Sequence, residues 1–75
     1  MTNAEYQQAK QELTNNRPVS AETIRKLQTL NKQYATRIKT CMANQDSAQA
    51  MFFKEDQFEI IGLIKKANQL LSNNA

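Results

Sequence analysis

The sequence predicts an all-α fold: an antiparallel helical hairpin of about residues 20–43 and 47–71, preceded by an additional N-terminal helix of about residues 3–14. Glycine and proline, the strongest helix breakers, are absent from Val19 to Ile61. Apolar residues recur in steps of three and four, as on one face of a helix. One stripe is Ile24, Leu27, Asn31, Tyr34, Ile38 and Cys41, and the other is Phe53, Gln57, Ile60, Ile64, Ala67 and Leu71. The stripes do not share a heptad phase, so one straight helix cannot aim both at one neighbour, and we expect the chain to fold back between them.

The N-terminal helix is predicted from the capping-box pattern Thr2-Asn3-Ala4-Glu5 and is expected to end at about Thr14. It places Tyr6, Ala9 and Leu13 on one face. Isolated helices of this length are marginal in water. Docking on the rest of the chain, docking on a partner and fraying therefore all remain open at this stage.

The second helix follows the clearest boundary in the chain, Asn15-Asn16-Arg17-Pro18-Val19. Pro18 disfavours a helical conformation at Arg17, and asparagines tolerate turn geometry. Ser20 is the expected N-cap, and Glu22 lies in the first turn, where the helix dipole favours an acid. We expect this helix to continue to about Ala43.

The third helix is expected after the polar segment Asn44-Gln45-Asp46-Ser47. Asp46 and Gln49 have capping-box spacing, which predicts a helix that continues to about Leu71. Gly62 lies inside it at a tolerable cost of up to about 1 kcal/mol. The alternative is a single unbroken helix from Ser20 to Leu71.

Length and composition favour one small domain, residues 1–75, with a core barely large enough to stabilise it. Cys41 is the only cysteine and histidine is absent, so neither a disulfide framework nor an ordinary zinc site can help. We therefore expect a protein partner or self-association to supply stability. The N-terminus lacks signal-peptide features and no apolar run is long enough to span a bilayer, so we expect a soluble cytoplasmic protein without membrane insertion.

An enzyme is not expected, because the sequence offers no histidine, no glycine-rich phosphate loop and no nucleophile beside an evident base. Asp56 and Glu59 are three residues apart, but they are interpreted as solvated acids near a helix N-terminus. We therefore predict no catalytic, cofactor or metal site.

The third helix carries the strongest interaction signal, because its apolar arc covers roughly 180°, more than one antiparallel neighbour buries. Met51 and Phe58 fall opposite the stripe and are expected to be exposed, as binding surfaces often are. The alternative is that the N-terminal helix covers part of this surplus. The predicted partner-binding residues are Met51, Phe52, Phe58, Ile61, Leu63 and Leu70.

Two further features have competing interpretations. Arg25, Lys32 and Lys39 are seven residues apart and line one edge of the second helix. They contact phosphates if the protein binds nucleic acid, or they face Glu55, Asp56 and Glu59 across the hairpin. Asn31 occupies a stripe position, where a polar residue can fix register or oligomeric state, as in a homo-oligomeric coiled coil. Alternatively, Leu30 carries the packing and Asn31 lies at the rim.

The segment from Glu22-Thr-Ile-Arg-Lys-Leu through Ile60-Ile61-Gly-Leu-Ile64 resembles the small co-chaperones of bacterial type III secretion. The resemblance, over residues 22–71, rests on size, a short polar turn, Phe52, Phe53 and Phe58 early in the last helix, and its isoleucine-rich middle. It implies a cytoplasmic helical hairpin that, with a larger repeat-helix chaperone, keeps the needle subunit from polymerising early. The apolar surface of the last helix would then contact the larger chaperone. The main alternative is a small nucleic-acid-binding or phage-type regulatory protein that uses the basic edge.

Overall fold

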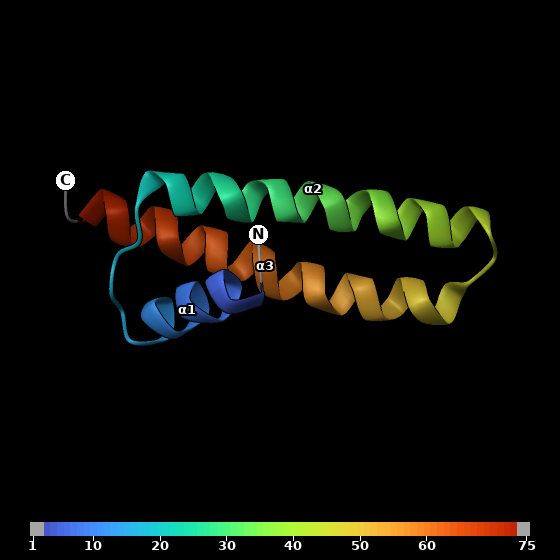
Figure 1. The fold of residues 1–75 in the computed structure, drawn as a ribbon, viewed down its shortest axis with the longest axis horizontal. Helices are drawn as coiled ribbons and strands as arrows, with labels where there is room; N and C mark the ends of the chain where they lie inside the picture. Colours follow the sequence, from blue (N-terminus) through green and yellow to red (C-terminus); the bar gives the residue numbers. More distant parts are fainter. Residues whose placement is uncertain (1–2, 74–75) are drawn as a thin grey trace.

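Three helices make up the computed structural model, which describes residues 3–73: α1 (Asn3–Thr14), α2 (Ala21–Ala43) and α3 (Ser47–Asn73). The predicted all-α fold, its helical hairpin and its N-terminal helix are confirmed (Figure 1). The single unbroken helix from Ser20 to Leu71 is wrong, because the chain turns between Ala43 and Ser47. The expected cap at Thr2 lies outside the described residues.

The helix ends form where local hydrogen bonding predicts them. After α1, Asn16 adopts the left-handed conformation (φ 59°), and the Arg17 N–H donates to the Glu12 carbonyl at 2.8 Å. This pairing satisfies carbonyls that the end of a helix would otherwise leave free. At the start of α2, the Thr23 N–H donates to the Ser20 hydroxyl oxygen at 3.2 Å, as expected of an N-cap.

The turn between α2 and α3 ends one helix and begins the next within three residues. Gln45 is left-handed (φ 60°), and the Asp46 N–H donates to the Cys41 carbonyl at 2.8 Å. The Asp46 carboxylate then accepts from the Gln49 N–H at 3.2 Å and caps α3. The predicted cap at Asp46 is confirmed.

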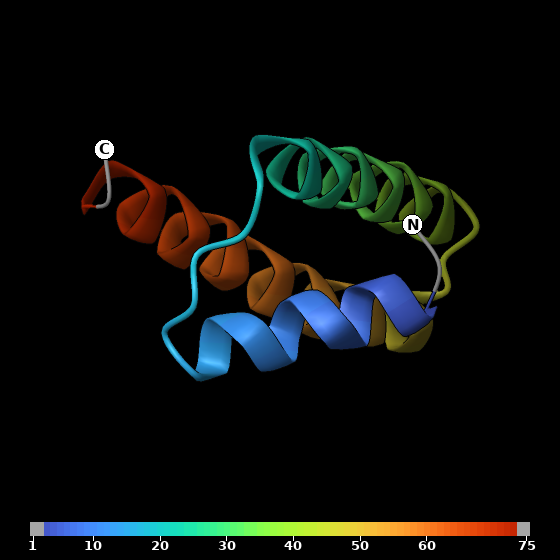
Figure 2. The same cartoon turned by 60° about the vertical axis from the view of Figure 1, so that its left-hand side comes forward.

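The helices run up, down and up, so that α1 and α3 are parallel and α2 is antiparallel to both (Figures 1 and 2). The molecule measures 44 × 18 × 17 Å. α1 is too short to cover the hairpin, and it lies beside the half that contains the C-terminal part of α3. The half nearer the α2–α3 turn contains two helices only (Figure 1).

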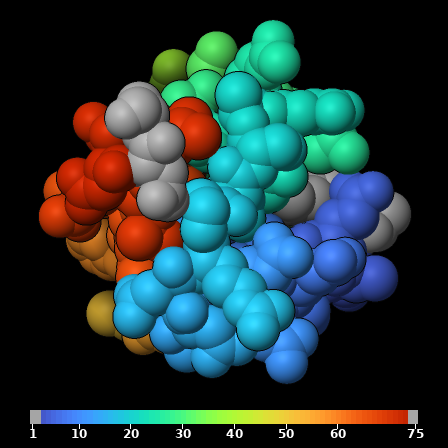
Figure 3. All heavy atoms as spheres, turned by 90° about the vertical axis from the view of Figure 1, so that its left-hand side faces the viewer, coloured from blue at the N-terminus to red at the C-terminus, as the bar shows by residue number. Residues whose placement is uncertain are grey.

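Most of the buried core lies in the half of the hairpin that α1 covers. Leu13, Leu27 and Ile60 are the largest fully buried side chains. Leu13 of α1 packs with Val19, Ile24 and Ala67, and Leu63 and Leu70 pack against this cluster. Figure 3 shows the segment between α1 and α2, in cyan, crossing the end of the bundle between α1 and α3. In the described structure α1 is therefore docked on the hairpin rather than frayed.

The two predicted stripes face each other, but their burial is uneven. Ile38 and Cys41 are only half-buried, because no third helix covers this half of the hairpin, and Tyr34 is half-buried at the edge of the part that α1 covers. Leu71 ends the second stripe and is 39 % exposed. It lies past the residues of α3 that α2 covers, because α2 begins only at Ala21.

Candidate protein-binding surface

Large apolar side chains on α3 are exposed to an unusual degree for so small a molecule. Phe58 is 74 % exposed, Phe52 68 % and Met51 66 %, and Met42 near the end of α2 is 54 % exposed. The predicted exposure of Met51 and Phe58 is therefore confirmed. Exposed aromatic and methionine side chains of this kind are typical of interaction surfaces.

The six predicted partner-binding residues do not share one open surface. Leu63 and Leu70 are half-buried and pack against the cluster around Leu13, so they belong largely to the fold. α1 thus accounts for part of the apolar surplus of α3, which was the alternative expectation. Phe52 projects from the same side of α3 as Leu63 and Leu70, by helical spacing, but lies nearer the turn than the residues α1 covers.

A second heptad-spaced stripe on α3 remains open. Met51, Lys54, Phe58, Ile61 and Lys65 recur in steps of three and four, and all are exposed except Ile61, which is half-buried. At 100° per residue they lie roughly 110–170° around α3 from the mean direction of the residues that face α1. Those residues are Asp56, Glu59, Leu63 and Leu70.

α2 carries a matching stripe. Its residues are Arg25, Gln28, Lys32, Ala35, Lys39 and Met42, all exposed and again spaced by three and four. Thr23, Lys26, Leu30 and Tyr34 line cavities together with α1 residues and so mark the side of α2 toward α1. The three cations of the stripe lie roughly 145–175° around α2 from that side. We call the two stripes together the open face, since each lies on the part of its helix that points away from α1.

The two stripes of the open face contain five cations, and exposed Glu55 lies beside Met51 and Phe58 on α3. Arg25, Lys32, Lys39, Lys54 and Lys65 make no ion pair within the described residues. The ion pairs lie on the side toward α1 or on the outer edge of α2: Lys10 pairs with Glu59, and Lys26 lies 3.8 Å from Glu5 and 4.0 Å from Glu22.

The expectation that the basic edge of α2 faces acids across the hairpin is wrong. Arg25, Lys32 and Lys39 pair with none of Glu55, Asp56 and Glu59. Asp56 and Glu59 line a cavity together with α1 residues, on the other side of the hairpin from the basic edge. The spacing of the cations along α2 was visible in the sequence, but their side relative to α1 was not.

A ring contact holds the two-helix half together. Tyr34 and Phe53 meet edge to face, with ring centroids 5.7 Å apart, and the Arg37 guanidinium lies 5.3 Å from the Tyr34 ring and 5.9 Å from the Phe53 ring. Such contacts stabilise by about 0.5–1.5 kcal/mol beyond burial. Sequence reasoning missed Arg37, although its spacing of three from Tyr34 placed the two side chains on neighbouring positions.

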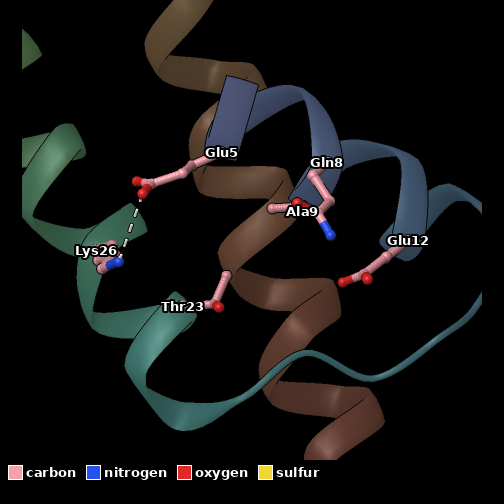
Figure 4. A pocket seen from close by; sticks show the side chains of 6 residues that line it. All are labelled: Glu5, Gln8, Ala9, Glu12, Thr23 and Lys26. Carbon is pink, nitrogen blue, oxygen red and sulfur yellow. Dashed lines mark ion pairs between the residues drawn. The ribbon is translucent and has the colours of Figure 1, made fainter. Parts of the chain in front are cut away.

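Small polar cavities flank α1. One of about 170 Å³ lies between α1 and α2, lined by Glu5, Gln8, Ala9, Glu12, Thr23 and Lys26 (Figure 4). A second, of about 380 Å³, lies between α1 and the hairpin and includes Tyr6 and Glu59. Burial and the adjacent Glu59 carboxylate, which accepts a hydrogen bond from the phenol, raise the pKa of Tyr6 to about 12. No group of three potential metal ligands occurs within residues 3–73.

Asn31 lies at the seam between α2 and α3. Its side chain is half-buried, and its Oδ1 atom is buried without a hydrogen-bond partner. A buried unpaired acceptor costs about 1–3 kcal/mol. This placement favours a position in the seam over one at the rim, and a role of Asn31 in setting oligomeric register stays a prediction.

Comparison with known proteins identifies no relative of this chain. No family model, no curated protein and no solved structure matches the chain. Within residues 3–73, no helix is both long and apolar enough to cross a membrane.

Proposed function

We propose that this protein is a non-enzymatic binding module that contacts another protein through exposed side chains of α3. The observation that carries the proposal is the exposure of Phe58 and Met51 on a single helix, since a small domain loses stability by leaving such groups in water. A partner that covers them stabilises the folded chain by mass action and is itself protected in the complex.

In its most specific form, the proposed partner is a larger chaperone and the protein is a cytoplasmic type III secretion co-chaperone. Two features support this role: the resemblance over residues 22–71 and a helical hairpin with a three-residue turn. The contacts are assigned to Met51, Phe58 and Ile61, whereas Leu63 and Leu70 are held by α1 and contribute to folding. Phe52 is a separate exposed group on the other side of α3.

The test is a binding measurement between the purified chain and the proposed partner, a larger type III secretion chaperone of the same organism. Phe58→Ala is expected to weaken the complex while the far-ultraviolet circular dichroism spectrum stays unchanged, because the side chain is exposed in the free chain. Lys66→Ala, also on α3 but outside the open face, is the control. Loss of helicity in Phe58→Ala without any change in association would count against the proposal. Equal binding by the wild type, Phe58→Ala and Lys66→Ala would also count against it.

Nucleic-acid binding is a second candidate, favoured by the unpaired cations on one face. Arg25, Lys32 and Lys39 lie seven residues apart, which is about 10.5 Å along a helix. Binding to phosphates through this edge would weaken steeply with added salt, whereas an apolar contact would respond little. A salt titration with duplex DNA and with RNA separates the two candidates.

A further inference from the structure

We propose that α3 pairs with α3 of a second copy of this chain, antiparallel, through the side of the helix that faces away from α1 and α2. The inference rests on the proposed role of α3 as a binding surface and names this chain itself as a partner of the same side chains. That side of α3 carries six exposed residues in alternating steps of four and three, which is the heptad pattern of paired helices. We call them the outer seam: Met51, Glu55, Phe58, Gly62, Lys65 and Gln69.

The outer seam lies where neither α1 nor α2 covers α3. Phe58, at its centre, lies roughly 140° around the helix from Phe53, which contacts α2, and roughly 100° from Glu59, which pairs with α1. The seam extends over about 27 Å from Met51 to Gln69, at 1.5 Å per residue. A second helix can therefore lie along the seam while α1 and α2 stay in place behind it.

The charges of the outer seam are complementary to those of its own copy when the two helices are antiparallel. Across a two-fold axis at the level of Ile60, residues equally far before and after that level face each other. Glu55 then lies opposite Lys65 of the second copy, and the symmetry makes this contact twice. Both side chains are exposed and form no ion pair within residues 3–73. Lys54 lies at the rim, where its long side chain reaches water.

The same register places Phe58 opposite Gly62 of the second copy. Phe58 is 74 % exposed, and a Cβ added at Gly62 would meet nothing within 4 Å, so the helix surface is open at this position. A glycine lets a neighbouring group approach the backbone closely. The ring of one copy can therefore lie on the bare helix surface of the other, and the two-fold axis again makes the contact twice.

Other arrangements suit these residues less well. A parallel pair would oppose Glu55 to Glu55 and Lys65 to Lys65, and like charges at short range repel. Phosphates would be repelled by Glu55, and phosphate contacts give no role to Phe58. In the antiparallel pair Glu59 comes near its own copy beside the axis, but Lys10 already pairs with it.

The dimer is expected to be weak, because one helix from each copy buries less surface than a standard interface. It uses Met51 and Phe58, which are also assigned to the contact with the larger chaperone. The dimer and that complex therefore exclude each other. Pairing would cover the exposed side chains of α3 until the larger chaperone binds.

The test is analytical ultracentrifugation of the full chain over a concentration series that extends into the millimolar range. We expect a monomer–dimer equilibrium without larger species, because two-fold pairing uses both seams. Phe58→Ala is expected to weaken dimerisation at least about fivefold, as for an aromatic anchor. The matched control is Phe52→Ala, which removes a similarly exposed phenylalanine outside the seam and is expected to leave the equilibrium unchanged.

Exchange of the seam charges tests the antiparallel register. Glu55→Lys and Lys65→Glu each oppose like charges at two symmetric places, so each is expected to weaken dimerisation. The double variant Glu55→Lys/Lys65→Glu restores opposite charges and is expected to regain the wild-type equilibrium. Lys32→Glu makes the same charge change as Lys65→Glu, but on α2, and is expected to have no effect. Circular dichroism of each variant checks that the helices are intact.

The inference is overturned if the wild type stays monomeric throughout the series, or if Phe52→Ala weakens dimerisation and Phe58→Ala does not. It is also overturned if the double variant dimerises no better than Glu55→Lys or Lys65→Glu alone. A monomeric chain that still binds the larger chaperone through Phe58 would leave the proposed function standing. If neither self-association nor partner binding depends on Met51 or Phe58, the inference and the proposed function both fail.

Discussion

Leu13→Ala is predicted to detach α1 while the hairpin of α2 and α3 stays folded. α1 fully buries Leu13 and nearly buries Ala9, which is 3 % exposed, while Tyr6 is half-buried beside Glu59. Burial of a leucine side chain and a methyl group stabilises the docking of α1 by roughly 2–4 kcal/mol in total. The ion pairs of Lys10 and Glu5 with the hairpin are exposed, and each contributes at most about 1 kcal/mol. Truncating a buried leucine costs about 2–5 kcal/mol, so this one substitution removes the largest single apolar contribution to the docking of α1.

The measurement is native-state hydrogen exchange by nuclear magnetic resonance. In Leu13→Ala, amides of residues 7–14 are expected to exchange almost as fast as in an unfolded chain, while those of residues 27–38 remain protected. Leu27→Ala is the control, because Leu27 is equally buried but belongs to the seam between α2 and α3. It should lower protection in all three helices together. If Leu13→Ala lowers protection in α1 and α2 to the same extent, α1 is an inseparable part of the core and the reasoning is refuted.

Three further predictions concern single groups. Gly62→Ala is expected to raise the free energy of unfolding, measured by urea denaturation, by about 0.5–1 kcal/mol. Gly62 lies inside a helix, and the added Cβ meets nothing within 4 Å. If stability does not increase, the backbone at Gly62 is under an unrecognised constraint. Asn31→Leu should stabilise by about 1 kcal/mol or more in the same assay, since it removes a buried acceptor without a partner, and a loss of stability would contradict that reading. The pKa of Tyr6 is raised from 10.0 to about 12 in the folded chain. The contribution of protonated Tyr6 to the free energy of unfolding is therefore complete below pH 10 and is lost as pH rises through 12. Thermal melts of the wild type should therefore fall more steeply over this range than those of Tyr6→Phe, and parallel curves would refute the assignment.

The helices and their ends could be predicted because their signals are local. Ser20 and Asp46 accept hydrogen bonds from amides three residues ahead, and this depends only on residue type and spacing. The heptad phases of the two stripes likewise required a turn, which formed at residues 44–46. A residue such as Gln45 in the left-handed conformation had no such signal, since glycine or asparagine is usual there.

The arrangement of the surface could be predicted only in part, because it depends on where α1 docks. Helical spacing showed that α3 has more apolar surface than α2 covers. It did not show which of two open sides α1 would occupy, and so it grouped Leu63 and Leu70 with Phe58 and Ile61. The position of Leu13 against Ala67 settles that choice, and it depends on the path of the segment between α1 and α2.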